Sequence, residues 1–86
     1  MNAYITADEA AQILAKAFAP FRCVAEPWDY GERIRFRVFD VDDEPLLTVE
    51  ELKKKQFSKQ EELQAVIATS RARLTQRGKV FDEMSP

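Results

Sequence analysis

The sequence has no histidine, a single cysteine and only two glycines among its 86 residues. Without histidine, the chain cannot supply a histidine general base, a serine–histidine triad or a histidine metal ligand. The one cysteine, Cys23, cannot form a disulfide within the chain and is typical of a reducing compartment. Two glycines do not provide a glycine-rich phosphate-binding loop. These absences predict a protein that is not an enzyme and that binds no cofactor.

Neither sign of charge dominates, because 13 lysines and arginines oppose 15 aspartates and glutamates, for a formal net charge of -2. Any basic surface that could attract nucleic acid must therefore be local. No apolar run approaches the roughly 20 residues of a membrane span, and the N-terminus lacks the basic and apolar regions of a signal peptide. We expect a cytoplasmic protein without a membrane partner, with one domain over residues 1–78 and a flexible tail over residues 79–86.

Apolar and cationic side chains alternate without a break over residues 33–38. Successive side chains of a β-strand point to opposite faces, so Ile34, Phe36 and Val38 should face a core. The opposite face should carry Arg33, Arg35 and Arg37. Since a single strand cannot bury its own apolar face, the flanking segments must supply further strands and a cover.

A helix is predicted before this strand, over about residues 7–18. Thr6 and Glu9 form a capping box at its start, and Pro20 ends it because the residue before a proline disfavours the helical conformation. Its apolar face should consist of Ala10, Ile13, Leu14, Ala17 and Phe18.

A second helix is predicted near the C-terminus. It should begin at Ser58, with Glu61 completing another capping box, and it should end at Gly78. Its apolar stripe should consist of Leu63, Val66, Ile67 and Leu74.

Two hairpins should join the alternating strand to its neighbours, through turns at residues 30–31 and 42–43. The first would pair Trp28 with Arg33, Glu26 with Arg35, Ala25 with Phe36, and Val24 with Arg37. The second would pair Val38 with Leu47, Phe36 with Val49, Arg35 with Glu50, and Arg33 with Leu52. Both registers gather apolar side chains on one face. They predict an α+β fold of order α-β-β-β-α, a three-stranded antiparallel meander with both helices packed on one face.

The opposite face of this meander would lack a cover, and it would mix arginines with apolar and aromatic side chains. Such patches often mark interaction sites, and tryptophan and arginine are enriched where binding energy concentrates. We therefore expect protein–protein contact through this face, with a protein partner or with a second copy in a homodimer. A solvated face with cross-strand ion pairs is the alternative. The expected contact residues are Arg22, Val24, Trp28, Arg33, Arg35, Arg37, Phe39 and Leu46, with Leu52 on the same face.

RNA or DNA binding is the alternative function. Arginines two residues apart on a strand stand roughly 7 Å from one another, a spacing similar to that of successive phosphates. Arg22, Arg37 and the lysines at residues 53–55 would supply the positive charge. Glu26 and Glu50 would flank the central arginine and offset its charge, so nucleic acid is the less favoured partner.

Two further features bear on possible chemistry. Cys23 should lie on the core face of an edge strand without an adjacent base, where a cysteine behaves as a small apolar residue. The acidic residues 40–44 lack the glycine and the distal glutamate of a calcium loop, so they should form a solvated turn and hold no metal. No small-molecule substrate is evident from the sequence.

Two resemblances follow from these patterns. The α-β-β-β-α order and the lysines before the second helix resemble the double-stranded RNA-binding domain, although Asp29-Tyr30-Gly31-Glu32 stands where that family has a histidine-bearing loop. Residues 58–62 also carry two acids where that family has bases. The segment Phe18-Ala19-Pro20-Phe21-Arg22-Cys23, followed by the alternating strand and a helix ending in Arg73-Leu74, is similar to a family of short bacterial proteins with a domain of unknown function. That resemblance spans roughly residues 5–78 and implies no activity and no functional residues.

Overall fold

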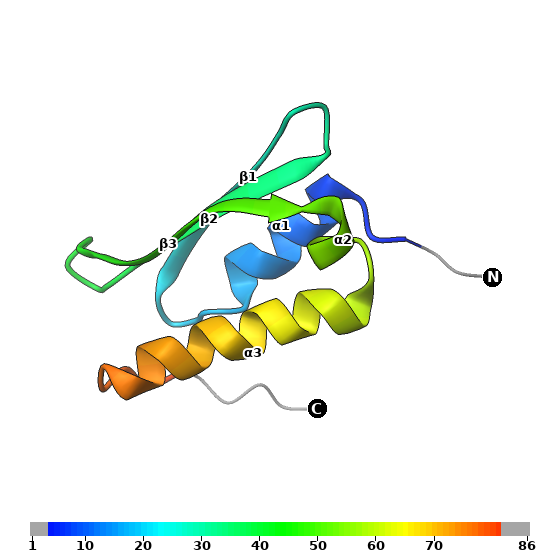
Figure 1. Ribbon diagram of the computed structural model, residues 1–86. Helices are drawn as coiled ribbons and strands as arrows, with labels where there is room; N and C mark the ends of the chain where they lie inside the picture. The colour runs from blue at the N-terminus through cyan, green and yellow to red at the C-terminus, as the bar shows by residue number, and fades with distance from the viewer. Residues whose placement is uncertain (1–3, 82–86) are drawn as a thin grey trace.

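The computed structural model describes residues 4–81 (Figure 1). Helices α1 and α3 lie on one side of a three-stranded sheet, so the predicted α+β fold is confirmed, with a short helix α2 added before α3. Among the described residues, no helix combines the length and the apolar character needed to cross a membrane. The elements are α1 (Ala7–Lys16), β1 (Arg22–Trp28), β2 (Arg33–Phe39), β3 (Pro45–Lys53), α2 (Lys54–Phe57) and α3 (Gln60–Gln76).

The predicted capping box fixes the start of α1. The Glu9 backbone N–H donates to the Thr6 hydroxyl at 3.1 Å, and the Thr6 backbone N–H donates to the Glu9 carboxylate at 3.0 Å. These bonds satisfy donors that have no partner within the helix. The helix ends at Lys16, earlier than predicted, and Ile13 is 37% exposed instead of buried. The buried face follows helical spacing from Ala7, which leaves Ile13 on its flank.

The first hairpin has the predicted register, with Trp28 opposite Arg33 and Val24 opposite Arg37. The loop between β1 and β2 passes through consecutive residues with positive φ and reaches Gly31 at a φ of 81°. Glycine has no Cβ and adopts this left-handed conformation without strain. The turn therefore supports the register that separates the arginine face of β2 from its apolar face.

The second hairpin follows the predicted register only in part. Phe36 pairs with Val49 as expected, but Ile34 pairs with Leu52, because the register shifts between Ile34 and Phe36. One extra residue of β3 is accommodated at this shift, which is a β-bulge opposite Arg35. The prediction that Leu52 lies on the uncovered face beside Arg33 is therefore wrong. The extra residue reverses the alternation, and Leu52 is only 2% exposed in the core.

The core lies between the sheet and the helices. Phe18, which follows α1, stacks on Phe36 of β2 with their ring centroids 5.7 Å apart. The short helix α2 brings Phe57 into the same core, where its side chain is fully buried. The other buried core residues are Ala7, Ala10, Leu14, Ala17, Cys23, Ile34, Val38, Leu52, Leu63, Ile67 and Leu74.

The segment after α3 contacts the rest of the fold. The Lys79 ammonium group lies 2.7 Å from the Asp40 carboxylate, and this hydrogen bond lowers the pKa of Asp40, assisted by the backbone N–H of Val41. The Phe81 ring meets the Phe21 ring edge-on, with centroids 5.5 Å apart. Lys79 and Phe81, which belong to the predicted flexible tail, thus contact the fold, while Val80 between them is exposed. Residues 82–86 of that tail lie outside the described residues.

Replacing Leu52 with alanine should destabilise the fold, because the bulge buries this side chain in the core. Leucine-to-alanine changes at buried sites lower the free energy of unfolding by about 2–5 kcal/mol. The measurement is urea denaturation of wild type and variant. Val41→Ala, at an exposed turn position, is the control and should stay within about 0.5 kcal/mol of wild type. A loss below about 1 kcal/mol for Leu52→Ala would contradict the bulge.

Candidate functional site

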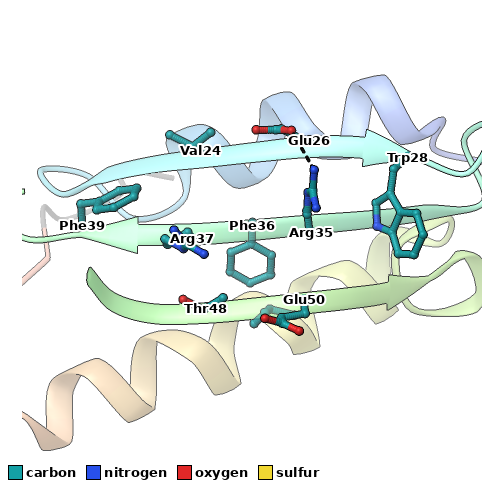
Figure 2. A pocket seen from close by; sticks show the side chains of 10 residues that line it. Val24, Glu26, Trp28, Arg35, Phe36, Arg37, Phe39, Thr48 and Glu50 are labelled. Carbon is teal, nitrogen blue, oxygen red and sulfur yellow. Dashed lines mark ion pairs between the residues drawn. The ribbon is translucent and has the colours of Figure 1, made fainter. Parts of the chain in front are cut away.

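The face of the sheet that points away from α1 and α3 is here called the outer face, and Figure 2 views it with the helices behind. None of the helices within residues 4–81 covers it. A shallow depression of about 580 Å³ runs along it, between the aromatic side chains of Trp28 and Phe39. The outer face consists of Arg22, Val24, Glu26, Trp28, Arg33, Arg35, Arg37, Phe39, Thr48, Glu50 and Glu51.

An arginine and an aromatic ring lie together at each end of the outer face. At one end the Arg33 guanidinium carbon lies 5.3 Å from the centre of the Trp28 ring. At the other end the Arg22 guanidinium carbon lies 4.3 Å from the centre of the Phe39 ring. Cation–π contacts of this kind contribute about 0.5–1 kcal/mol at exposed sites. Trp28 is 38% exposed in this arrangement.

Arg33 and Arg22, at the two ends of the outer face, both form ion pairs with carboxylates. Arg33 lies 3.4 Å from the Asp29 carboxylate and 3.3 Å from that of Glu51. Arg22 lies 3.2 Å from the Asp43 carboxylate. Because these groups are exposed to solvent, each pair contributes little to stability, about 0–1 kcal/mol. The pairs do reduce the positive charge available to an anionic ligand.

The centre of the outer face carries a fourth ion pair. Arg35 lies 3.5 Å from the Glu26 carboxylate, as the predicted cross-strand register implies. The predicted second partner of Arg35, Glu50, forms no ion pair with it within residues 4–81. The bulge is the reason, because it sets both Glu50 and Glu51 opposite Arg35, and Glu51 pairs with Arg33 instead.

Two opposite charges at the centre are therefore left without a partner. Arg37 lies between Val24 and Thr48 and has no carboxylate within ion-pair distance in the part of the chain that the structure describes. Glu50, also exposed, has no cation within that distance among the same residues. Both side chains rise from the outer face in Figure 2. This arrangement can accept one external anion beside Arg37 and one external cation beside Glu50.

The structure places almost all of the predicted contact residues on the outer face; Leu46 is the exception. Its side chain packs against the core cluster, and its backbone carbonyl accepts a hydrogen bond of 2.7 Å from Arg77. Glu50 was predicted only as a partner of Arg35, and its unpaired state follows from the bulge. The sequence does contain a signal for the bulge, because apolar residues of β3 recur at Leu47, Val49 and Leu52, a step of two followed by a step of three.

The acidic turn uses its carboxylates within the fold. Asp40 pairs with Lys79, Asp43 pairs with Arg22, and Asp42 accepts a hydrogen bond of 3.2 Å from the Glu44 backbone N–H. The described residues contain no group of three or more histidine, cysteine, aspartate or glutamate side chains that could hold a metal ion.

The lysines at residues 53–55, between β3 and α3, also lie near acidic side chains. Lys54 lies 3.8 Å from the Glu32 carboxylate, with both side chains exposed. Lys53 is the N-cap of α2, and its backbone N–H donates a hydrogen bond of 2.9 Å to the Gln56 side chain. This segment therefore forms the start of a helix whose charge is already partly offset.

Comparisons with protein-family models, with curated proteins and with solved structures find no match to this chain. The resemblances to the double-stranded RNA-binding domain and to the short bacterial family stay expectations drawn from the sequence pattern.

Cys23 should be almost unreactive toward thiol reagents in the folded protein. It faces the core from β1, and burial raises its pKa to about 12, so the reactive thiolate is scarce at pH 8. The measurement is the rate of alkylation by iodoacetamide at pH 8, with and without urea. We expect modification to require unfolding and to be at least about 100-fold slower in the native protein. Equal rates in the two states would contradict the buried position and would reopen a role for Cys23 as a nucleophile.

Proposed function

We propose that the protein is a small cytoplasmic, non-enzymatic binding protein that acts by protein–protein contact through the outer face. The observation that carries this proposal is the combination of side chains on an uncovered sheet. Two aromatic rings, two arginines and two glutamates line one depression there, and two further arginines lie against the rings. Tryptophan and arginine are the residue types that most often dominate the energy of protein interfaces.

The position of Trp28 suits it to anchor a partner. Arg33 lies against its ring, and 38% of the residue is exposed and available for contact. A ring that is already ordered loses little conformational entropy on binding. The polar atoms around it are ion-paired, so a partner that covers the ring need not leave new buried charges unpaired at this end.

A protein partner fits the charge pattern better than a nucleic acid does. Phosphate backbones bind surfaces on which cations are free to replace condensed counterions. On the outer face, Arg22, Arg33 and Arg35 each have a carboxylate within 3.5 Å. Glu50 adds an unpaired negative charge at the centre. Alternating charges of both signs are instead typical of surfaces that pair with a complementary protein surface.

Trp28→Ala should remove most of the partner binding. We expect the amount of protein cross-linked to the tagged chain in its native cells to fall about tenfold or more, since a tryptophan that anchors an interface commonly contributes at least about 2 kcal/mol. The measurement is quantitative mass spectrometry of the cross-linked material. Tyr30→Ala is the matched control, because Tyr30 is an aromatic residue of the same hairpin that projects fully into solvent. This control should retain wild-type cross-linking.

The variants should unfold at the same urea concentration as wild type, so that a loss of binding is not a loss of fold. Equal cross-linking of wild type and Trp28→Ala would contradict the proposal. The proposal would also be contradicted if the purified chain bound single-stranded or duplex RNA in a mobility-shift assay at about 50 mM salt and released it at about 500 mM salt. Such steep salt dependence is typical of phosphate binding.

A further inference from the structure

The outer face is complementary in charge to a copy of itself. Its central cation Arg37 and its central anion Glu50 both lack partners among the described residues, and they lie in adjacent rows of the same face. We infer that the partner at this face is a second copy of the chain, in a two-fold dimer in which Arg37 of each copy pairs with Glu50 of the other. This inference rests on the proposed role of the outer face in protein–protein contact.

The geometry of the rows sets the position of the two-fold axis. One row contains Glu26 and Arg35, with Glu50 beside them at the bulge, and the next contains Arg37 with its neighbours. Alternate residues of a strand are about 7 Å apart, so the two rows are separated by that distance. We place the two-fold axis in the plane of the interface, perpendicular to the strands, so that it crosses β2 at Phe36, midway between the rows. It then lays the Arg37 row of each copy over the Arg35 row of the other, with β1 over β1 and β3 over β3.

This axis brings the two unmatched charges together twice. Arg35 leans toward Glu26 on the β1 side, as the ion pair between them shows in Figure 2. The guanidinium group of Arg37 lies over Arg35 of the second copy, whose charge Glu26 already offsets, and it reaches Glu50 of that copy on the β3 side. The same contact recurs by symmetry, so the dimer contains two identical ion pairs. Neither copy needs to break an ion pair that it already has.

The same axis matches the two ends of the outer face. It lays the end that carries Trp28 over the end of the second copy that carries Arg22 and Phe39. The Arg22 guanidinium, already on the face of Phe39, then lies between that ring and the indole of the other copy. Stacking of a guanidinium between two rings is favourable on both of its faces.

Other positions of the axis match less well. An axis over Arg35 lays the Glu26–Arg35 row over the same row of the other copy. Glu26 then lies over Glu26, and Arg35 lies over Arg35, so like charges meet. An axis over Arg37 stacks two unpaired arginines on each other. Like charges in contact are unfavourable at an interface. The position between the rows is the one that uses both unmatched charges.

The size of the face predicts a weak dimer. Three strands spaced by about 4.8 Å, with seven residues rising about 3.3 Å each, give a footprint of roughly 300 Å². A standard protein interface buries about 800 Å² on each partner. We therefore expect a dissociation constant of about 10–100 μM, and we expect the association to be sensitive to single charge reversals.

The test is sedimentation equilibrium from about 10 μM to about 1 mM, a range that brackets the expected dissociation constant. Wild type should shift from its mass of 9.9 kDa toward twice that value. Arg37→Glu and Glu50→Arg should each weaken self-association about tenfold or more, because each puts like charges together. An equimolar mixture of these two variants should form a dimer again, since the carboxylate introduced in one variant then meets the guanidinium introduced in the other.

The control reverses a charge away from the interface. Arg73→Glu, on the exposed surface of α3, should associate like wild type. A wild-type chain that remains monomeric at about 1 mM would overturn the second copy as partner, while Trp28-dependent cross-linking to another protein would still support the proposed function.

Three other outcomes overturn the inference. The first is a dimer that neither charge reversal weakens, because another surface would then mediate it. The second is a mixture of the variants that stays monomeric while wild type dimerises. The third is an ion pair between Arg37 and Glu50 within one copy. The two charge reversals would then have non-additive effects on the free energy of unfolding when combined, and the sedimentation mass would not change. If Trp28→Ala also leaves cross-linking unchanged, the proposed function fails together with the inference.

Discussion

The structure depends on the strict alternation of apolar and cationic side chains along β2. Ile34, Phe36 and Val38 are almost completely buried, while Arg35 and Arg37 between them are exposed. A shift of the strand by one residue would put the arginines into the core, where unpaired charge is prohibitively unfavourable. Both neighbouring strands and both long helices must therefore lie where they do. The outer face follows from this core, because alternate residues of β2 point to the core and to the outer face.

The β-bulge in β3 shapes both faces of the sheet at once. On the inner side it turns Leu52 into the core, close to where α2 brings in Phe57. On the outer side it sets two glutamates opposite Arg35, of which only Glu51 finds an arginine, and that arginine is Arg33. The unpaired charge of Glu50 is thus a consequence of closing the core. Bulges often occur where a sheet redirects a side chain for function, and this one supplies half of the charge pair of the dimer that we propose.

Local rules explain which features could be predicted from the sequence. The capping box of Thr6 and Glu9 and the register at Gly31 depend on residues that are neighbours in the chain, and both are as predicted. The predicted capping box of Ser58 and Glu61 is wrong, because Ser58 ends α2 and α3 begins only at Gln60, after Lys59, without a side-chain cap. A register extended from the turn does not predict the bulge, because it assumes one residue of β3 for each residue of β2, although the spacing from Val49 to Leu52 contains the signal. The outer face as a whole could be predicted, since it follows from alternation. Within it, the ion pair of Arg35 with Glu26 follows from the predicted register, whereas the pairing of Arg33 with Glu51 and the unpaired state of Glu50 do not, because they depend on the bulge.

The central proposal is that a second copy of the chain binds through the residues opposite the core, on β2 and its neighbours. Nuclear magnetic resonance of the labelled chain over a dilution series tests this most directly, because the Trp28 indole N–H and the arginine side-chain N–H groups of the outer face each give their own signal. The account predicts concentration-dependent shifts of the Trp28, Arg35 and Arg37 signals, while exposed positions of α1 and α3 stay constant. Shifts confined to the helices, or none at any position up to about 1 mM, would contradict it.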